Sequence, residues 1–132
     1  ASVNLFNGKA DFYKMGAASS FLVRGAHVRR IDQAALPIGI IPTLKLTHRS
    51  APLALGDIIV MVSDGITEAD KEDDEARWLQ EILRQIRTGR ESAETIVPRR
   101  LARKILEEAQ QRCGCREHDD LTVLVALVES TR

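Results

Sequence analysis

The chain has 132 residues, of which 44% are hydrophobic and 29% charged, as in a globular domain and unlike a disordered segment. Lysine plus arginine and aspartate plus glutamate number 19 each, so the balanced charge argues against a nucleic acid partner. Apolar runs such as residues 58–62 are far shorter than the ~20 residues of a membrane-spanning helix. The two cysteines are separated by a single residue, which is a poor disulfide framework and fits a reducing compartment. We therefore expect a cytoplasmic segment that is not embedded in a membrane.

Short apolar runs at the beginning of the chain predict two β-hairpins. Residues 2–6 and 9–15 flank an Asn-Gly pair, which favours a hairpin turn because both residues tolerate a positive φ. Residues 21–24 and 27–31 flank a Gly-Ala pair and predict a second, shorter hairpin. Four strands are therefore expected before residue 35.

The middle of the chain predicts one connector and two strands. Residues 36–42 are apolar but contain two prolines and a glycine, which favours a buried irregular connector. Residues 43–49 alternate apolar and polar side chains and predict a half-exposed strand. Residues 58–62 are uniformly apolar, which predicts a central strand covered on both faces.

The last third of the chain predicts two helices and a strand. Apolar residues recur at helical spacing over 78–86 and 101–109, with Gly89 between the two helices and Pro98 tolerated near the start of the second. Residues 121–128 are apolar and β-branched, as in a strand. The order of strands, helix, helix and strand, without an internal repeat or linker, predicts one α+β domain with antiparallel strands.

Aspartates occur at the ends of the two most apolar predicted strands. Asp64 follows the strand over 58–62, with Gly65 permitting a tight departure of the chain, and Asp119 and Asp120 precede the final strand. If these strands are antiparallel neighbours, Asp64 and Asp119 meet at one edge of the sheet. Two close carboxylates repel each other unless a cation intervenes, and oxygen ligands suit Mg²⁺ or Mn²⁺. Taken singly, each aspartate is more often a turn residue.

Two segments resemble the last two signature motifs of the PPM (PP2C-type) metal-dependent phosphatases. They are GDIIVMVSDGITEA at 56–69 and DDLTV at 119–123. Residues 14–21 and 36–40 resemble the sporulation protein E branch of that family, so the resemblance covers nearly the whole chain. It implies a PP2C-like antiparallel β-sandwich flanked by helices, with two Mn²⁺ or Mg²⁺ ions at one edge.

Position by position, the resemblance assigns metal binding to Asp64 and Asp119. Asp120 falls where relatives often have asparagine, so the resemblance gives it, like Gly65, a secondary place beside the ligands. The implied reaction is hydrolysis of phosphoserine or phosphothreonine without a covalent phosphoenzyme. The implied substrate is a phosphorylated anti-sigma-factor antagonist, and its dephosphorylation activates a sporulation sigma factor.

The chain departs from the family pattern at one point. The early Asp-Gly-x-Gly motif, which supplies a metal-bridging aspartate, does not occur in residues 1–132. We therefore expect the C-terminal portion of a single phosphatase domain, truncated at its N-terminus, with weak metal binding and no activity on its own. Surface exposed by such a truncation could also support a homodimer.

Two functions of other classes compete with this hypothesis. One is a non-catalytic regulatory or protein-interaction domain that keeps the fold, although retention of Asp64 and Asp119 counts against it. The other is a phosphoacceptor domain with clustered aspartates. Such domains alternate parallel strands with helices, whereas this chain begins with hairpins.

Four further features favour structural explanations. The Cys-Gly-Cys sequence at 113–115 and His118 lack a fourth partner for a zinc site. The acidic run at 70–75 fits the start of a helix, where negative charge is favourable. The basic residues within 99–104 suit a solvated helix face, and Trp78 is expected in the core.

Overall fold

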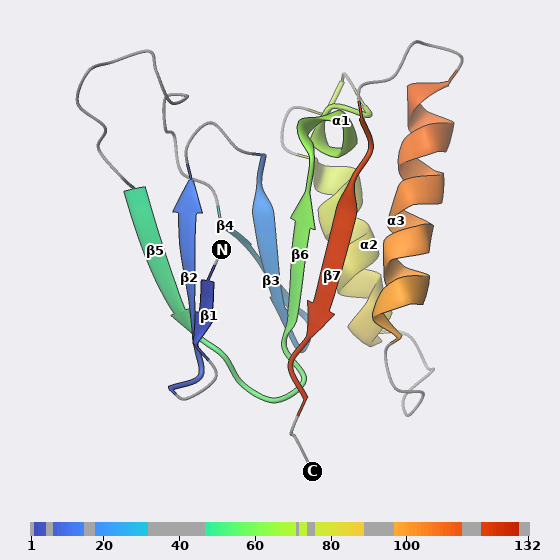
Figure 1. The fold of residues 1–132 in the computed structure, drawn as a ribbon. Helices are drawn as coiled ribbons and strands as arrows, with labels where there is room; N and C mark the ends of the chain where they lie inside the picture. Colours follow the sequence, from blue (N-terminus) through green and yellow to red (C-terminus); the bar gives the residue numbers. More distant parts are fainter. Residues whose placement is uncertain are drawn as a thin grey trace, which may run out of the picture.

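In the part of the chain that the structure describes, two antiparallel β-sheets combine with three helices. In the computed structural model, six strands are followed by the three helices and then by one strand, in agreement with the α+β class expected from the sequence (Figure 1). The residues that the structure describes are 2–4, 7–14, 18–31, 47–70, 72–73, 76–88, 97–114 and 120–129.

The first sheet contains β1 (Ser2–Asn4), β2 (Lys9–Lys14) and β5 (Thr47–Pro52), in the order β1-β2-β5. The expected hairpin between β1 and β2 is confirmed. Gly8 has a φ of +61°, whereas Asn7 contributes through its side chain, which accepts a hydrogen bond from the Lys9 N–H at 3.1 Å. Of the two residues expected to take a positive φ, only Gly8 does so.

The second sheet has the order β4-β3-β6-β7, and all its neighbours are antiparallel. Its strands are β3 (Ser20–Arg24), β4 (His27–Ile31), β6 (Ile58–Val62) and β7 (Val123–Leu127). The strand predicted at 58–62 is central, and its first three residues are buried. The two most apolar strands, β6 and β7, are antiparallel neighbours, which was the condition for bringing their aspartates together.

Two strand predictions need correction. The strand expected over 43–49 includes Thr47 but continues to Pro52, which is tolerated because β5 lies at an edge of its sheet. Residues 43–46 and the connector expected at 36–42 lie outside the described residues. The last strand begins at Val123 rather than at residue 121, and Leu124 on it is 52% exposed.

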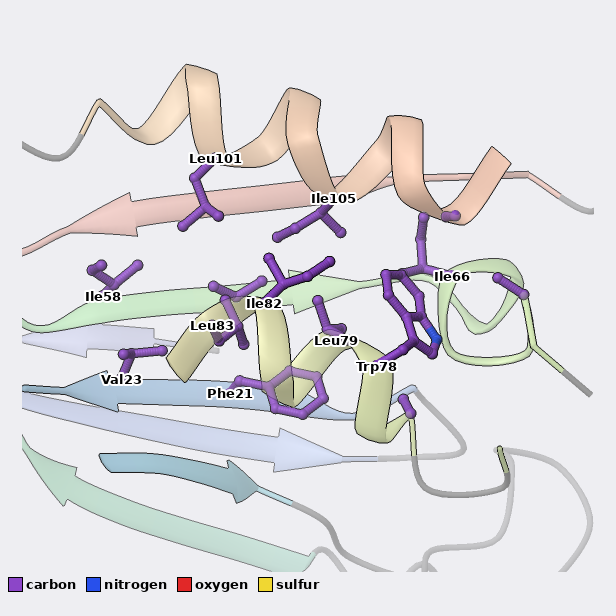
Figure 2. Close-up of a cluster of buried hydrophobic side chains, with 14 residues drawn as sticks. Phe21, Val23, Ile58, Ile66, Trp78, Leu79, Ile82, Leu83, Leu101 and Ile105 are labelled. Atoms are coloured by element: carbon purple, nitrogen blue, oxygen red, sulfur yellow. The ribbon is translucent and has the colours of Figure 1, made fainter. Parts of the chain in front are cut away.

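Helices α2 (Arg77–Thr88) and α3 (Pro98–Cys113) confirm the two helical predictions. Both pack on one face of the second sheet, and Figure 2 shows their apolar side chains directed toward β3 and β6. Trp78 is 6% exposed and belongs to this core, as expected. The largest members of the cluster are Phe21, Val23, Ile58, Val60, Ile66, Trp78, Leu79, Ile82, Leu83, Leu101 and Ile105.

The opposite face of the second sheet packs against the first sheet. Alternation along β3 directs Phe21 and Val23 toward the helices and Leu22 toward the other sheet. The cluster between the sheets comprises Ala10, Phe12, Leu22, Ile31, Ala51 and Ile59. The expected sandwich is therefore present, with helices outside its second sheet. Among the described residues, no helix is long and apolar enough to cross a membrane.

Candidate metal centre

Asp64 lies at the junction of β6 and a short helix. The strand ends at Val62, and α1 (Asp64–Thr67) begins two residues later. Ile66 is fully buried and anchors this helix to the core. The carboxylate of Asp64 remains exposed and accepts a hydrogen bond from the Gly65 N–H at 3.1 Å. The junction thus holds an aspartate at the end of an apolar strand with its charge facing solvent.

Gly65 lies where the chain leaves β6 and enters α1. It is buried within that helix, its φ is not positive, and its secondary place beside the metal ligands stays a prediction. Sequence reasoning missed α1 because four residues are too few for a periodic pattern, and glycine disfavours a helix. Gly65 therefore lies in a helix rather than in a turn.

Asp120 lies three residues before the start of β7 and is close to the end of β6. Its carbonyl oxygen accepts a hydrogen bond from Ser63 Oγ at 2.7 Å, and the same oxygen of Ser63 accepts the Thr122 N–H at 3.0 Å. Asp64 follows Ser63 directly, so Asp64 and Asp120 lie at the same end of the second sheet. This is the end at which β6 stops and β7 begins (Figure 1).

Only one of the two predicted metal ligands, Asp64, lies among the described residues. Asp119 lies outside the described residues, so its contact with Asp64 stays a prediction. Asp120, the next residue, is described and exposed. The antiparallel pairing on which the prediction depends is confirmed, since Val62 lies opposite Val123.

The chemistry of these residues fits a hard divalent cation. Exposed carboxylates leave room for the waters that Mg²⁺ keeps in its coordination sphere, and oxygen donors match Mg²⁺ and Mn²⁺. Within the described ranges, no three histidine, cysteine, aspartate or glutamate side chains gather closely enough to hold a metal ion. Asp64 and Asp120 can therefore form only part of a ligand set.

A second aspartate flanks β6 at its other end and has a different environment. Asp57 is 1% exposed. Its two carboxylate oxygens accept hydrogen bonds from Arg24 Nε at 2.9 Å and Nη2 at 2.6 Å, and one of them also accepts the Ala54 N–H at 2.8 Å. The hydrogen bonds to Asp57 and its negative charge raise the pKa of Arg24 above its ordinary value. Sequence reasoning missed this pair.

Three of the features that the sequence assigned to structural roles are described at least in part. Asp73, in the acidic run before α2, accepts the Trp78 N–H at 2.9 Å, as expected for a helix start. The basic residues 99, 100, 103 and 104 are exposed on α3. Cys113 is a half-buried free thiol, whereas Cys115 and His118 lie outside the described residues.

Two packed antiparallel sheets with outer helices, together with aspartates where adjacent strands end and begin, define the class of PP2C-type phosphatase domains. A solved structure of this class supports the assignment. It contains the PP2C phosphatase domain and part of the regulatory domain of the Bacillus subtilis cell fate determinant SpoIIE. The similarity has a TM-score of 0.79 at 29% identity and covers 96% of this chain and 36% of the other.

The chain belongs to the stage II sporulation protein E (SpoIIE) family, whose family model matches residues 1–129. It is 29% identical to stage II sporulation protein E of Bacillus subtilis over 128 residues and of Priestia megaterium over 131 residues. It covers 15% and 21% of the lengths of those proteins. A Mn-presoaked structure of the Bacillus subtilis phosphatase domain has a TM-score of 0.76 at 26% identity, over 99% of this chain and 56% of the other.

Proposed function

We propose that this chain forms the C-terminal part of the catalytic domain of a metal-dependent protein serine/threonine phosphatase. In this proposal Asp64 and Asp119 are metal ligands, and the early Asp-Gly-x-Gly motif belongs to a preceding part of the same domain. The observation that carries the proposal is the antiparallel pairing of β6 with β7. It brings Asp64 to the end of the sheet at which the segment containing Asp120 begins.

Membership of the SpoIIE family supports metal dependence, and one matched structure of the Bacillus subtilis phosphatase domain is Mn-presoaked. When bound, Mn²⁺ or Mg²⁺ acts as a Lewis acid that neutralises charge on the phosphoryl oxygens. The carboxylate of Asp64 is suited to holding such a cation because it is exposed and has one side-chain hydrogen bond among the described residues. Asp120 has a secondary role beside the proposed ligands, and Ser63 holds its backbone carbonyl group by a hydrogen bond.

The proposed substrate is a phosphorylated anti-sigma-factor antagonist, and the proposed consequence is activation of a sporulation sigma factor in the cytoplasm. This step rests on family membership, since the matched relatives are stage II sporulation proteins. The balanced charge of the chain is compatible with recognition of a phosphoprotein through local contacts. We propose that turnover requires the longer protein, because two described carboxylates do not complete a metal site.

Hydrolysis of p-nitrophenyl phosphate with Mn²⁺ tests the proposal in a longer phosphatase domain that contains this chain. Asp64→Asn and Asp119→Asn should each lower turnover more than about 100-fold, beyond the ~10–100-fold typical of residues that only support ligands. Asp120→Asn should have a smaller effect. This chain alone should show little turnover at any Mn²⁺ concentration.

Two controls make this experiment decisive. Glu129→Gln removes an exposed carboxylate beyond the far end of β7 and should leave turnover unchanged. Asp64→Asn should change the free energy of unfolding by no more than about 0.5 kcal/mol, as for other exposed positions, so lost turnover would not reflect lost folding. Full turnover in the Asp64 or Asp119 variant would refute the assignment.

A further inference from the structure

Ser63 makes an unusual set of hydrogen bonds for a residue at its position. It immediately precedes α1 with φ −76° and ψ 166°, the extended conformation of a helix N-cap. A serine there usually accepts a hydrogen bond from an N–H group of its own helix. The Ser63 side chain makes no such bond. Its hydroxyl group is therefore available for contacts outside the helix.

The Ser63 hydroxyl instead joins the two segments that carry the aspartates. Oγ donates to the carbonyl oxygen of Asp120 at 2.7 Å and accepts the Thr122 N–H at 3.0 Å. The Ser63 N–H donates to the Thr122 carbonyl oxygen, also at 3.0 Å. Three hydrogen bonds thus extend the contact between the strands beyond their last paired residues, Val62 and Val123.

We propose that Ser63 is a positioning residue for the metal centre, and that its hydroxyl fixes the spacing between the segments that present Asp64 and Asp119. This inference rests on the proposed function above. The first ligand follows Ser63 in the chain, and the second precedes Asp120, whose carbonyl group Ser63 holds. Loss of the hydroxyl would leave β6 and β7 paired but would release the segment before β7.

Hydrogen-bond chemistry explains why a hydroxyl group suits this place. The contacts require one atom that donates to a carbonyl oxygen and accepts from an N–H group, and a serine oxygen can do both. Both contacts lie at an exposed rim, where water can replace them with small loss of folding stability. A metal site is more demanding, because its ligands must be held within about 0.5 Å of the productive geometry. We therefore expect metal affinity to respond more strongly than folding.

The inference is tested by measuring Mn²⁺ binding to a longer phosphatase domain that contains this chain. Electron paramagnetic resonance of the free ion measures this binding directly. Ser63→Ala should weaken Mn²⁺ binding by about 10-fold or more, the range for residues that orient metal ligands. Ser63→Thr keeps the hydroxyl group and should bind Mn²⁺ with an affinity within about 3-fold of the parent. This change is smaller than the ~10–100-fold losses that follow removal of a residue that orients metal ligands. The Ala variant should also need more Mn²⁺ for half-maximal turnover while keeping its turnover at saturating Mn²⁺.

A matched control separates positioning from general damage. Thr122 bonds Ser63 through its backbone alone, and its exposed side chain can be changed to valine without removing those bonds. Thr122→Val should keep the parental Mn²⁺ affinity. The thermal midpoint of the metal-free Ser63→Ala variant should fall by no more than about 4–8 °C, the shift for a loss of about 1 kcal/mol, because water replaces both hydrogen bonds of the hydroxyl group at the exposed rim.

The Asp64→Asn variant distinguishes failure of this inference from failure of the proposed function. If Asp64→Asn leaves Mn²⁺ binding intact, both the metal centre and the role of Ser63 are refuted. If Asp64→Asn abolishes binding while Ser63→Ala binds like the parent, only the role of Ser63 is refuted. Equal weakening in the Ala and Thr variants would also refute it, because the hydroxyl group would then not be the cause.

Discussion

The two aspartates that flank β6 differ in almost every respect except residue type. Asp57 precedes the strand, is 1% exposed, and accepts two hydrogen bonds from Arg24 and one from the Ala54 N–H. Asp64 follows the strand at the start of α1, is exposed, and accepts one side-chain hydrogen bond, from Gly65. One strand thus has a structural carboxylate at one end and an available carboxylate at the other.

The comparison shows how environment separates these two roles. A buried carboxylate must be paired, because an uncompensated charge in the interior is very costly. Once the oxygens of Asp57 bind Arg24 and Ala54, little capacity remains for a ligand. Asp64 keeps its hydration, so a cation can replace water at modest cost. Saturation of hydrogen-bonding capacity therefore identifies the structural aspartate better than sequence context does.

The largest predicted effect comes from breaking the pair at Asp57. Arg24→Ala removes the cationic partner of a buried carboxylate, and should lower the free energy of unfolding by about 3 kcal/mol. Urea denaturation at neutral pH measures this change. Asp57→Asn should cost less, because the asparagine carries no buried charge and half of the Arg24 side chain is already in solvent.

A control arginine on the adjacent strand tests whether this loss is specific to the pair. Arg29 is exposed on β4, and Arg29→Ala should change the free energy of unfolding by no more than about 0.5 kcal/mol. A similar loss in the Arg24 and Arg29 variants would remove the energetic distinction between the two ends of β6.

An intermediate case sharpens the comparison. Asp73 is half-buried, and its carboxylate accepts the Trp78 N–H at 2.9 Å where α2 begins. Asp73→Ala should lower the free energy of unfolding by about 1 kcal/mol, the usual value for a lost helix cap. Fluorescence of Trp78, the only tryptophan in the chain, can follow the unfolding.

The neighbouring Glu72 offers a control for this prediction. Glu72 is exposed, and Glu72→Ala should have an effect below about 0.5 kcal/mol. If the variants at 72 and 73 were equally destabilised, general acidity before the helix, rather than the bond to Trp78, would account for the stabilisation.

The features that could be predicted from the sequence are those encoded by local patterns. Turn-forming glycines between apolar runs located both early hairpins, helical spacing located α2 and α3, and a run of five apolar residues located β6. The antiparallel pairing of β6 with β7 was the condition under which their aspartates would meet, and the structure shows this pairing. The tendency of Asp73 to stabilise a helix start was also visible, because negative charge favours that place.

The features that could not be predicted depend on residues distant in sequence. Asp57 and Asp64 both border an apolar strand beside a glycine, and Arg24, the charged partner that Asp57 has, lies 33 positions before it. The Ser63 hydroxyl contacts a residue 57 positions away, so its departure from ordinary helix capping is a tertiary effect. Helix α1 is too short to produce a periodic signal.

The smallest predicted effect concerns a carboxylate that is paired but not buried. Asp11 on β2 lies 2.9 Å from His48 Nε2 on β5, and this hydrogen bond, with one from Ser50, holds the pKa of Asp11 below its ordinary value of 3.8. The ionised form is therefore favoured in the folded state. Its contribution to stability is present above pH 3.8 and is lost as the pH falls through the lower, folded-state pKa.

Urea midpoints measured at neutral pH and at several values below pH 3.8 test this prediction. The parent should lose slightly more stability in acid than Asp11→Asn, which has no carboxyl group to protonate at that position. The difference should be small because solvent screens an exposed ion pair. If it matched the loss in Arg24→Ala, pairing alone would set the energetic value of these aspartates. A much smaller difference would identify burial as the cause of the contrast between the two ends of β6.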